Sequence, residues 1–82
     1  MLFRSQREGS VVYSKVPQVY WDQKERRRIN GKIDLVAVKN GIITAYELET
    51  SGLQYKSEAK LKAFECNAAY IICHDGKAKR IK

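Results

Sequence analysis

The sequence predicts a small α/β domain, in which a mixed sheet of order β–β–β–α–β carries a helix on one face. Strand-like segments flank an Asn-Gly turn, a run of helix-forming residues follows them, and a short apolar segment follows that run. With 82 residues the chain has room for one modest core, so we expect a single domain over residues 1–82 with flexible ends at 1–9 and 76–82. A strand–helix–strand unit crosses over right-handed, which would make the last strand parallel to the third.

The chain begins with a polar stretch and then becomes strand-like. Residues 1–9 are expected to form either a short helical turn or a frayed end. Residues 10–21, SVVYSKVPQVYW, are rich in Val, Tyr and Trp and roughly alternate in polarity. Pro17 cannot donate a hydrogen bond to a neighbouring strand, so this strand is expected at a sheet edge or with a bulge. Residues 21–32, WDQKERRRINGK, are expected to form an exposed connection.

The dipeptide Asn40-Gly41 predicts a hairpin between strands at residues 33–38 and 42–49. A type I′ turn needs positive φ at both central residues, which Asn and Gly tolerate. If the turn has two residues, Lys39 pairs with Ile42, and every further pair follows by counting outward along both strands.

This register sets acidic residues against each other. Asp34 faces Glu47, and one step further from the turn Lys32 faces Glu49. Directly opposed Cβ atoms lie about 4.5–5.5 Å apart, so two like charges there are destabilising. A hard cation such as Mg²⁺ would relieve the repulsion, because it prefers oxygen ligands. The alternative is a pair of solvated carboxylates at the sheet rim, with Glu49 in a salt bridge to Lys32.

Alternation of side chains along a strand sorts the hairpin into two faces. The face that carries Asp34 and Glu47 also carries Val36 and Ala45, whereas Ile33 projects from the other face. We therefore expect one sheet face that is acidic at the far end and apolar toward the turn.

A helix is predicted after the break at Thr50-Ser51-Gly52, with Ser51 as its cap and its start at residue 53 or 54. The run QYKSEAKLKAFECNAA favours helix through its Ala, Lys, Glu and Leu content. The expected apolar face consists of Tyr55, Ala59, Ala63 and Cys66, and Leu61 and Phe64 widen the expected buried surface. Lys56, Lys60 and Lys62 are expected to point more outward. Residues 69–73 then form a short buried strand, and residues 76–82 leave as a basic tail.

The composition indicates a basic chain without a membrane segment. Lys and Arg outnumber Asp and Glu by 16 to 9, and the resulting charge of +7 favours a polyanionic partner such as nucleic acid. No apolar run resembles a signal peptide or reaches the ~20 residues of a membrane span, so we expect a cytoplasmic protein with no membrane partner. Cys66 and Cys73 lack metal-ligand spacing and are expected to be two small buried apolar side chains in a reducing compartment.

An Asp opening one strand, a hairpin, and then Glu-x-Lys with Thr or Ser on the next strand is the signature of the PD-(D/E)xK nuclease superfamily. The chain resembles it through Ile33-Asp34 and, thirteen positions on, residues 47–52, ELETSG. The order of strands and helix over residues 32–75 supports the resemblance better than the identities of the motif residues do. Within the superfamily, the pattern is most similar to the archaeal Holliday-junction resolvases, which have a similar short hairpin and following helix.

The resemblance implies a restriction-endonuclease-like core and a metal-dependent endonuclease that acts on branched or duplex DNA as a homodimer. Asp34 and Glu47 would hold Mg²⁺ or Mn²⁺, with the Leu48 carbonyl as a third ligand. The metal would activate water and neutralise the charge developing on the phosphate. Beside such a sheet, DNA contact is favoured over a solvated surface for the basic side chains Lys24, Arg26, Arg27, Arg28, Lys56 and Lys60.

The chain departs from the motif at the lysine that helps to position or activate water. Glu49 stands there, as in some restriction enzymes of the superfamily. Lys32, predicted opposite Glu49, is the first substitute, and Lys56 and Lys60 are alternatives. Glu8 is the candidate for the further acid that resolvases take from an N-terminal helix. Two other readings stay open, a catalytically degenerate nucleic-acid-binding protein on the same fold and an adaptor whose acidic pair is incidental.

Overall fold

The computed structural model describes residues 2–4, 10–49 and 54–82. Its elements in chain order are β1 (Leu2–Arg4), β2 (Val11–Asp22), β3 (Arg27–Lys39), β4 (Ile42–Glu49), α1 (Gln54–Ala63), β5 (Ala68–Cys73) and β6 (Ala78–Arg80). The strands form one six-stranded sheet whose spatial order is the same as their order in the chain. The domain is therefore α/β with a mixed sheet and one packed helix, as the sequence predicts.

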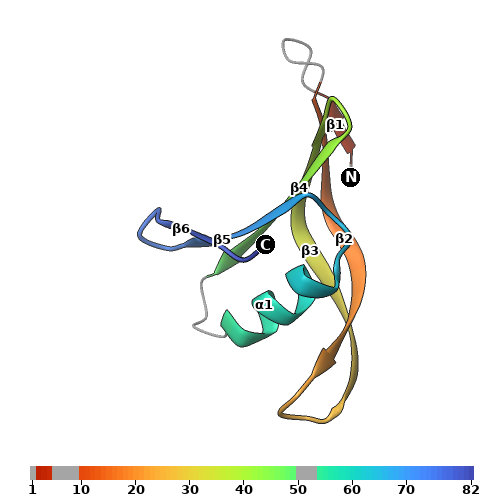
Figure 1. Ribbon diagram of the computed structural model, residues 1–82, viewed down its shortest axis with the longest axis vertical. Helices are drawn as coiled ribbons and strands as arrows, with labels where there is room; N and C mark the ends of the chain where they lie inside the picture. The colour runs from red at the N-terminus through yellow and green to blue at the C-terminus, as the bar shows by residue number, and fades with distance from the viewer. Residues whose placement is uncertain (1, 5–9, 50–53) are drawn as a thin grey trace.

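The sheet is antiparallel except at one junction. Strands β4 and β5 run parallel, and α1 makes the connection between them. Figure 1 shows α1 on one side of the sheet, and the β2–β3 hairpin extends beyond the helix at one end. The helix and the parallel pair thus define the central part of the molecule, and β1 and β6 lie at the two edges.

The predicted central hairpin is confirmed. Asn40 and Gly41 have φ of 52° and 78°, as a tight turn of this kind requires. The β3–β4 register runs from Lys39 opposite Ile42 to Leu35 opposite Tyr46. The backbone pairing that defines this register stops there, one position before Asp34 and Glu47.

The core joins the sheet to α1. Its buried members are Ile33, Val36, Ala45, Leu61, Ala69 and Ile71. Ile33 and Val36 are three positions apart on β3 and both are buried, so the core-facing side of this strand switches between them. The expectation that Ile33 projects away from the face of Val36 is therefore wrong. The switch coincides with Lys15 on β2, which has a φ of 55° and lies opposite Asp34 in the β2–β3 register.

The helix is shorter than predicted and presents a different face. It ends at Ala63, because Asn67 is held by β4: its backbone N–H donates to the Ile43 carbonyl, and its side-chain oxygen accepts from the Ile43 N–H, both at 2.8 Å. The buried helix residues are Ser57 and Leu61. The predicted burial of Leu61 is thus confirmed, whereas the predicted apolar face of Tyr55, Ala59, Ala63 and Cys66 is wrong. The predicted cap, Ser51, lies outside the described residues.

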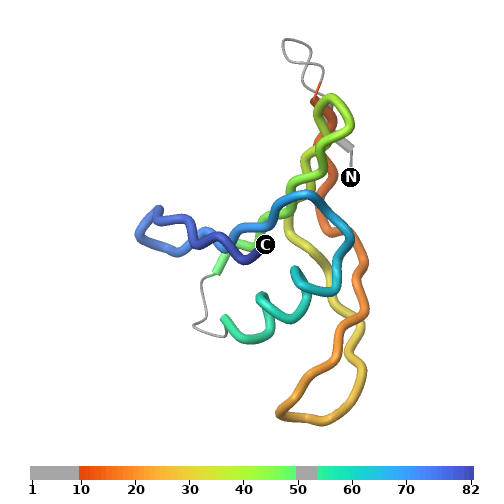
Figure 2. Tube along the Cα trace, viewed as in Figure 1, coloured from red at the N-terminus to blue at the C-terminus, as the bar shows by residue number. Residues whose placement is uncertain are grey.

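The two predicted irregular segments are largely regular structure. Residues 2–4 form β1 rather than helix, and most of the expected connection at 21–32 belongs to β2 and β3. Residues 78–80 form β6 rather than a loose tail, and the Ile81 N–H then donates to the Ala69 carbonyl at 2.8 Å. Figure 2 shows the C-terminus returning toward the middle of the molecule. No helix in the described ranges is long and apolar enough to cross a membrane.

Candidate active site

The predicted acidic residues gather in a cavity of ≈ 230 Å³ between the β3–β4 strands and α1. Its lining residues are Tyr20, Asp34, Glu47, Leu48, Glu49, Lys56, Ser57 and Lys60. We call this space the acid cavity. Asp34, Glu47, Leu48 and Glu49 come from the central hairpin, and the two lysines come from α1. Most residues named from the sequence as a candidate site therefore lie around one space.

Asp34 and Glu47 lock the end of the hairpin through their side chains. The Asp34 N–H donates to Glu47 Oε2, and the Leu48 N–H donates to Asp34 Oδ2, both at 2.8 Å. Carboxylate oxygens thus replace the backbone carbonyls that would accept these bonds in a continuous ladder. Bonds from N–H groups to ionised acceptors are shorter and stronger than neutral ones. Each acid is consequently held in one orientation by the other's strand.

Lys60 brings a positive charge from α1 to the acidic pair. Its ammonium lies 2.6 Å from Glu47 Oε1, and it also donates to the Lys32 carbonyl at 3.0 Å. The side chains of Lys60 and Glu47 are 16% and 3% exposed, so the pair is largely shielded from solvent. The expectation that Lys60 points outward is therefore wrong, and its ammonium is the one that reaches Glu47.

The first predicted substitute, Lys32, lies elsewhere. Its Cα pairs with Pro17 on β2 and its side chain is exposed, while only its backbone carbonyl takes part in the site. The predicted facing of Lys32 and Glu49 also falls beyond the point where β3 and β4 stop pairing. Glu49 is buried and accepts a hydrogen bond from Ser57 Oγ at 3.3 Å.

Two side chains at the site carry no sequence signal of a role there. Lys15 Nζ lies 3.3 Å from Asp34 Oδ1, in a pair that is more exposed than Lys60–Glu47. The β2–β3 register that brings Lys15 opposite Asp34 depends on the four-residue turn 23–26, for which the sequence offers no dipeptide as clear as Asn-Gly. Ser57 is buried on α1 behind Glu49, and it would be found only by knowing which helix face is inward.

Gly31 provides the space through which Lys60 crosses β3. A Cβ at this position would lie 2.7 Å from Lys60 Cδ and 2.8 Å from Tyr20 Cε1. Real Cβ contacts are essentially never this short, and the two neighbours are held in place, Lys60 by Glu47 and Tyr20 by burial. The glycine therefore allows a helix lysine to reach an acid on the sheet.

Replacing Gly31 with alanine is expected to lower the free energy of unfolding by about 1–3 kcal/mol, because overpacking forces side chains off their rotamers. Urea unfolding followed by circular dichroism measures this loss. Asn30→Ala is the matched control, since Asn30 is exposed on the same strand and should stay within about 0.5 kcal/mol of wild type. Wild-type stability of Gly31→Ala would mean that Lys60 does not need this path.

The oxygen atoms around the acid cavity suit a hard divalent cation. Asp34, Glu47 and the Leu48 carbonyl offer two carboxylates and a neutral oxygen, the ligand types that Mg²⁺ takes. Each carboxylate oxygen can accept more than one contact, so the bonds described above leave acceptor capacity. Within residues 2–4, 10–49 and 54–82, no group of three or more His, Cys, Asp or Glu side chains is arranged to hold a metal. A divalent cation here would be held by the two carboxylates, with solvent completing its coordination.

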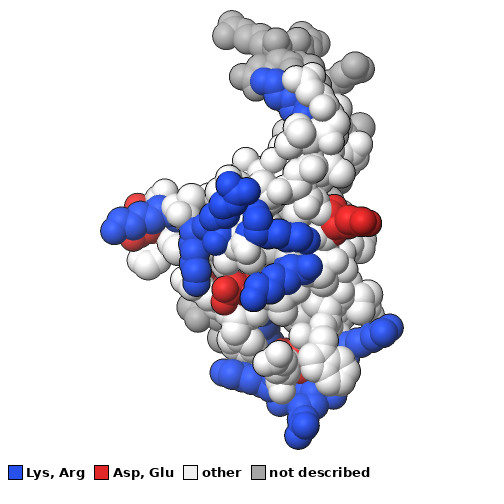
Figure 3. Space-filling view, in the orientation of Figure 1, with Lys and Arg blue, Asp and Glu red and all other residues white. Residues whose placement is uncertain are grey.

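The other predicted DNA-binding residues lie at the end of the β2–β3 hairpin. Lys24, Arg26, Arg27 and Arg28 are all exposed there. Figure 3 shows Lys and Arg side chains gathered at this end of the molecule, with a further group nearer its middle. The Lys24 ammonium also lies 4.3 Å from the centre of the Tyr55 ring, a cation–π contact that ties the hairpin turn to α1.

Glu8, the predicted further acid, lies outside the described residues. Cys66 and Cys73 are free and pack against the core, but both are only partly buried, so the expectation that they are fully buried is wrong. Comparison with protein-family models, with curated proteins and with solved structures finds no match to this chain.

Proposed function

We propose that this protein is a metal-dependent DNA endonuclease that resembles the PD-(D/E)xK superfamily, with a restriction-endonuclease-like β–β–β–α–β core over β2 to β5. The observation that carries the proposal is the Lys60 ammonium 2.6 Å from Glu47, beside an Asp34 fixed by its own hydrogen bonds. Two acids and one lysine in a single cavity are the residue types that the motif demands, although the lysine comes from α1 rather than from β4.

Each residue has a distinct task in this proposal. Asp34 and Glu47 bind Mg²⁺ or Mn²⁺, and their bonds to backbone N–H groups keep the carboxylates oriented before the metal arrives. When bound, the metal activates water and neutralises charge on the phosphate. Lys60 orients the attacking water or the phosphate oxygen through its N–H groups, in a cavity where solvent screening is weak. Glu49, held by Ser57, contributes a further negative charge at the edge of the site.

Surface charge supports DNA as the substrate. The chain carries a net charge of +7, and four exposed basic residues of the β2–β3 hairpin extend beyond the helix. Phosphate contacts of this kind fix the position of DNA without reading its sequence. Lys56 lines the acid cavity and would contact a phosphate near the cleaved bond.

A homodimer is the proposed state on branched or duplex DNA, where two strands must be cut. The small core favours association, since domains of this size gain little stability from their own burial. The exposed large apolar residues Tyr13, Val19, Trp21, Ile42 and Leu48 offer surface for it.

The deciding experiment is a cleavage assay with Mn²⁺ on four-way-junction, duplex and single-stranded DNA. Wild-type protein should cut at least one substrate, and Asp34→Ala and Glu47→Gln should lose cutting while still binding DNA. Asp75→Asn is the control for loss of one acid, because Asp75 lies in the β5–β6 turn and does not line the acid cavity. Equal cutting by wild type and by Glu47→Gln would exclude the proposed site.

A second candidate is a nucleic-acid-binding protein on the same fold that has lost catalysis. The same ion pair favours it, because Lys60 already neutralises the Glu47 carboxylate without a metal. Such a protein should bind DNA with an affinity that falls steeply as salt is raised, yet cleave none of the three substrates. The assay above therefore separates the two functions when binding is measured alongside cleavage.

A further inference from the structure

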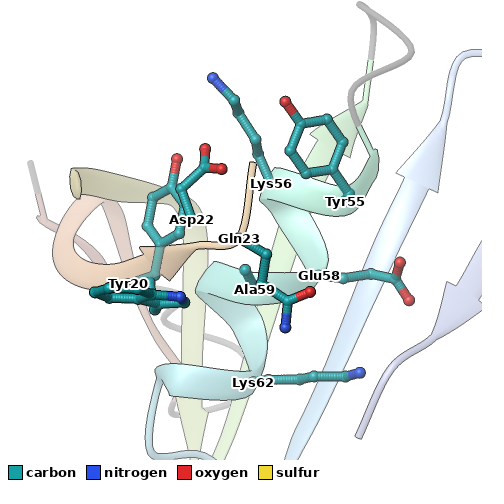
Figure 4. Close-up of a pocket in the computed structure, with 9 residues that line it drawn as sticks. Tyr20, Asp22, Gln23, Tyr55, Lys56, Glu58, Ala59 and Lys62 are labelled. Carbon is teal, nitrogen blue, oxygen red and sulfur yellow. The ribbon is translucent and has the colours of Figure 1, made fainter. Parts of the chain in front are cut away.

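A second cavity of ≈ 210 Å³ lies where the end of β2 and the following turn meet α1. Its lining residues are Tyr20, Trp21, Asp22, Gln23, Tyr55, Lys56, Glu58, Ala59 and Lys62, most of which Figure 4 labels. We call it the turn cavity. It is smaller than the about 300–1,000 Å³ of pockets for drug-sized ligands, so it suits a group the size of one ring system.

Asp22 brings a buried and incompletely bonded carboxylate to this cavity. The residue is 2% exposed. Its Oδ1 accepts the N–H groups of Lys24 and Glu25 at 2.9 and 3.1 Å, which shapes the turn. Its Oδ2 is buried and has no hydrogen-bond partner among the residues that the structure describes. Buried polar atoms are nearly always bonded, so Oδ2 is an acceptor that awaits a donor.

The turn cavity adjoins the acid cavity. Tyr20 and Lys56 line both spaces, so the two cavities lie on either side of these two side chains. In Figure 4 the end of the Lys56 side chain lies on the same side of the pocket as the Asp22 carboxylate. Lys56 is a long side chain with several rotatable bonds, so it can move to admit a ligand to the cavity.

We propose that the turn cavity binds an unpaired nucleobase that carries an amino group, with Asp22 Oδ2 accepting its N–H. This inference rests on the proposed action on DNA. The base in the turn cavity would belong to a nucleotide next to the phosphate that the acid cavity binds. Cytosine and adenine present exocyclic amino donors. Thymine has only its ring N3–H as a donor, and the carbonyl oxygens on both sides of it repel an approaching carboxylate. In a duplex these donors are paired, so the site selects single-stranded or branched DNA, whose bases can leave the stack.

Side chains around Asp22 complete the site for a nucleotide. Tyr55, whose ring carries the Lys24 ammonium at 4.3 Å from its centre, supplies aromatic surface on which bases of any sequence stack. Lys56 and Lys62 supply positive charge for the adjoining phosphates. The acceptor on Asp22 therefore provides selectivity, and its neighbours provide affinity.

Fluorescence anisotropy with labelled dC12 and dT12 in EDTA tests this proposal without cleavage. Wild-type protein should bind dC12 about fivefold more tightly than dT12, which is less than the discrimination of a full bidentate base contact because one oxygen acts alone. Asp22→Asn should abolish or reverse the preference. Its side-chain oxygen can still accept the two turn N–H groups, while an NH₂ donor replaces Oδ2.

Two controls isolate the effect. Asp75→Asn removes the same charge from another turn-forming aspartate, whose Oδ1 accepts the Lys77 N–H at 3.0 Å, and it should keep the wild-type preference. If Asp22→Asn fails to fold, an oligonucleotide of N4,N4-dimethylcytosine tests wild-type protein instead, since this base lacks the N–H donors and should bind no better than dT12.

The possible failures are distinct. Salt-dependent binding of both oligonucleotides with no preference would overturn the base site and leave the proposed action on DNA intact. Absence of binding to any DNA, junctions included, would overturn both.

Discussion

Replacing Lys60 with methionine is expected to slow Mn²⁺-dependent DNA cleavage about 100-fold. Methionine keeps most of the length of the side chain but removes the ammonium that lies 2.6 Å from Glu47. Removal of one positioned donor from a water-excluded site commonly costs about 10²–10³ in rate. Single-turnover kinetics on the preferred substrate, with protein in excess, would measure the chemical step separately from binding.

The Lys77→Met variant is the matched control, because it removes the same charge from the exposed β5–β6 turn. It should cleave at nearly the wild-type rate. A second readout does not depend on activity: Mn²⁺ should raise the melting temperature of Lys60→Met more than that of wild type, since in the variant the metal is the cation that neutralises Glu47. Wild-type cleavage by folded Lys60→Met would remove Lys60 from the mechanism.

Replacing Glu47 with alanine is expected to lower the free energy of unfolding by about 3–5 kcal/mol, because the Lys60 ammonium is then buried without its partner. The Asp34 N–H loses its acceptor in the same variant. Small domains are stable by only about 5–15 kcal/mol, so the loss is a large share of the total. Equilibrium unfolding in urea with unchanged m-values is the measurement.

A double-mutant cycle tests whether the pair itself is responsible. Glu47→Leu combined with Lys60→Met should be more stable than either single variant, because it buries two apolar chains instead of one unpaired charge. The Lys79–Glu58 pair is the control for a surface ion pair, with an N–O distance of 3.7 Å and side chains 52% and 33% exposed. Glu58→Ala should cost no more than about 1 kcal/mol. Additive effects at Glu47 and Lys60 would show that the two side chains are not coupled.

The part of the fold governed by local chemistry was predictable. Asn40 and Gly41 set a two-residue turn, and the turn sets the β3–β4 register as far as Leu35 and Tyr46. The strand–helix–strand order likewise followed from residue composition. Strand β6 was missed because its residues are basic and exposed, and its pairing with β5 is a tertiary contact that no local pattern marks.

The sequence predicted the position of the acidic residues in the candidate site, but it did not predict the position of Lys60. Counting along the hairpin placed Asp34 near Glu47, which the hydrogen bonds between the two strands bear out. The position of Lys60 depends on which helix face packs against the sheet, and small residues at Ala59 and Ala63 suggested the wrong face. It also depends on Gly31, whose missing side chain matters only once two distant segments meet. Such effects arise from tertiary packing, which produces no periodic pattern in the sequence.

The separation of β3 and β4 beyond Leu35 bears on the order in which the protein folds. Before α1 docks, the far end of the hairpin holds the negative charges of Asp34 and Glu47 without the ammonium of Lys60. We therefore expect the β3–β4 pairs nearest Asn40 and Gly41 to form first. The end of the hairpin that carries Asp34 and Glu47 would become ordered only when the helix packs against it. Helix docking would then be the step at which the last strand contacts and the site form together.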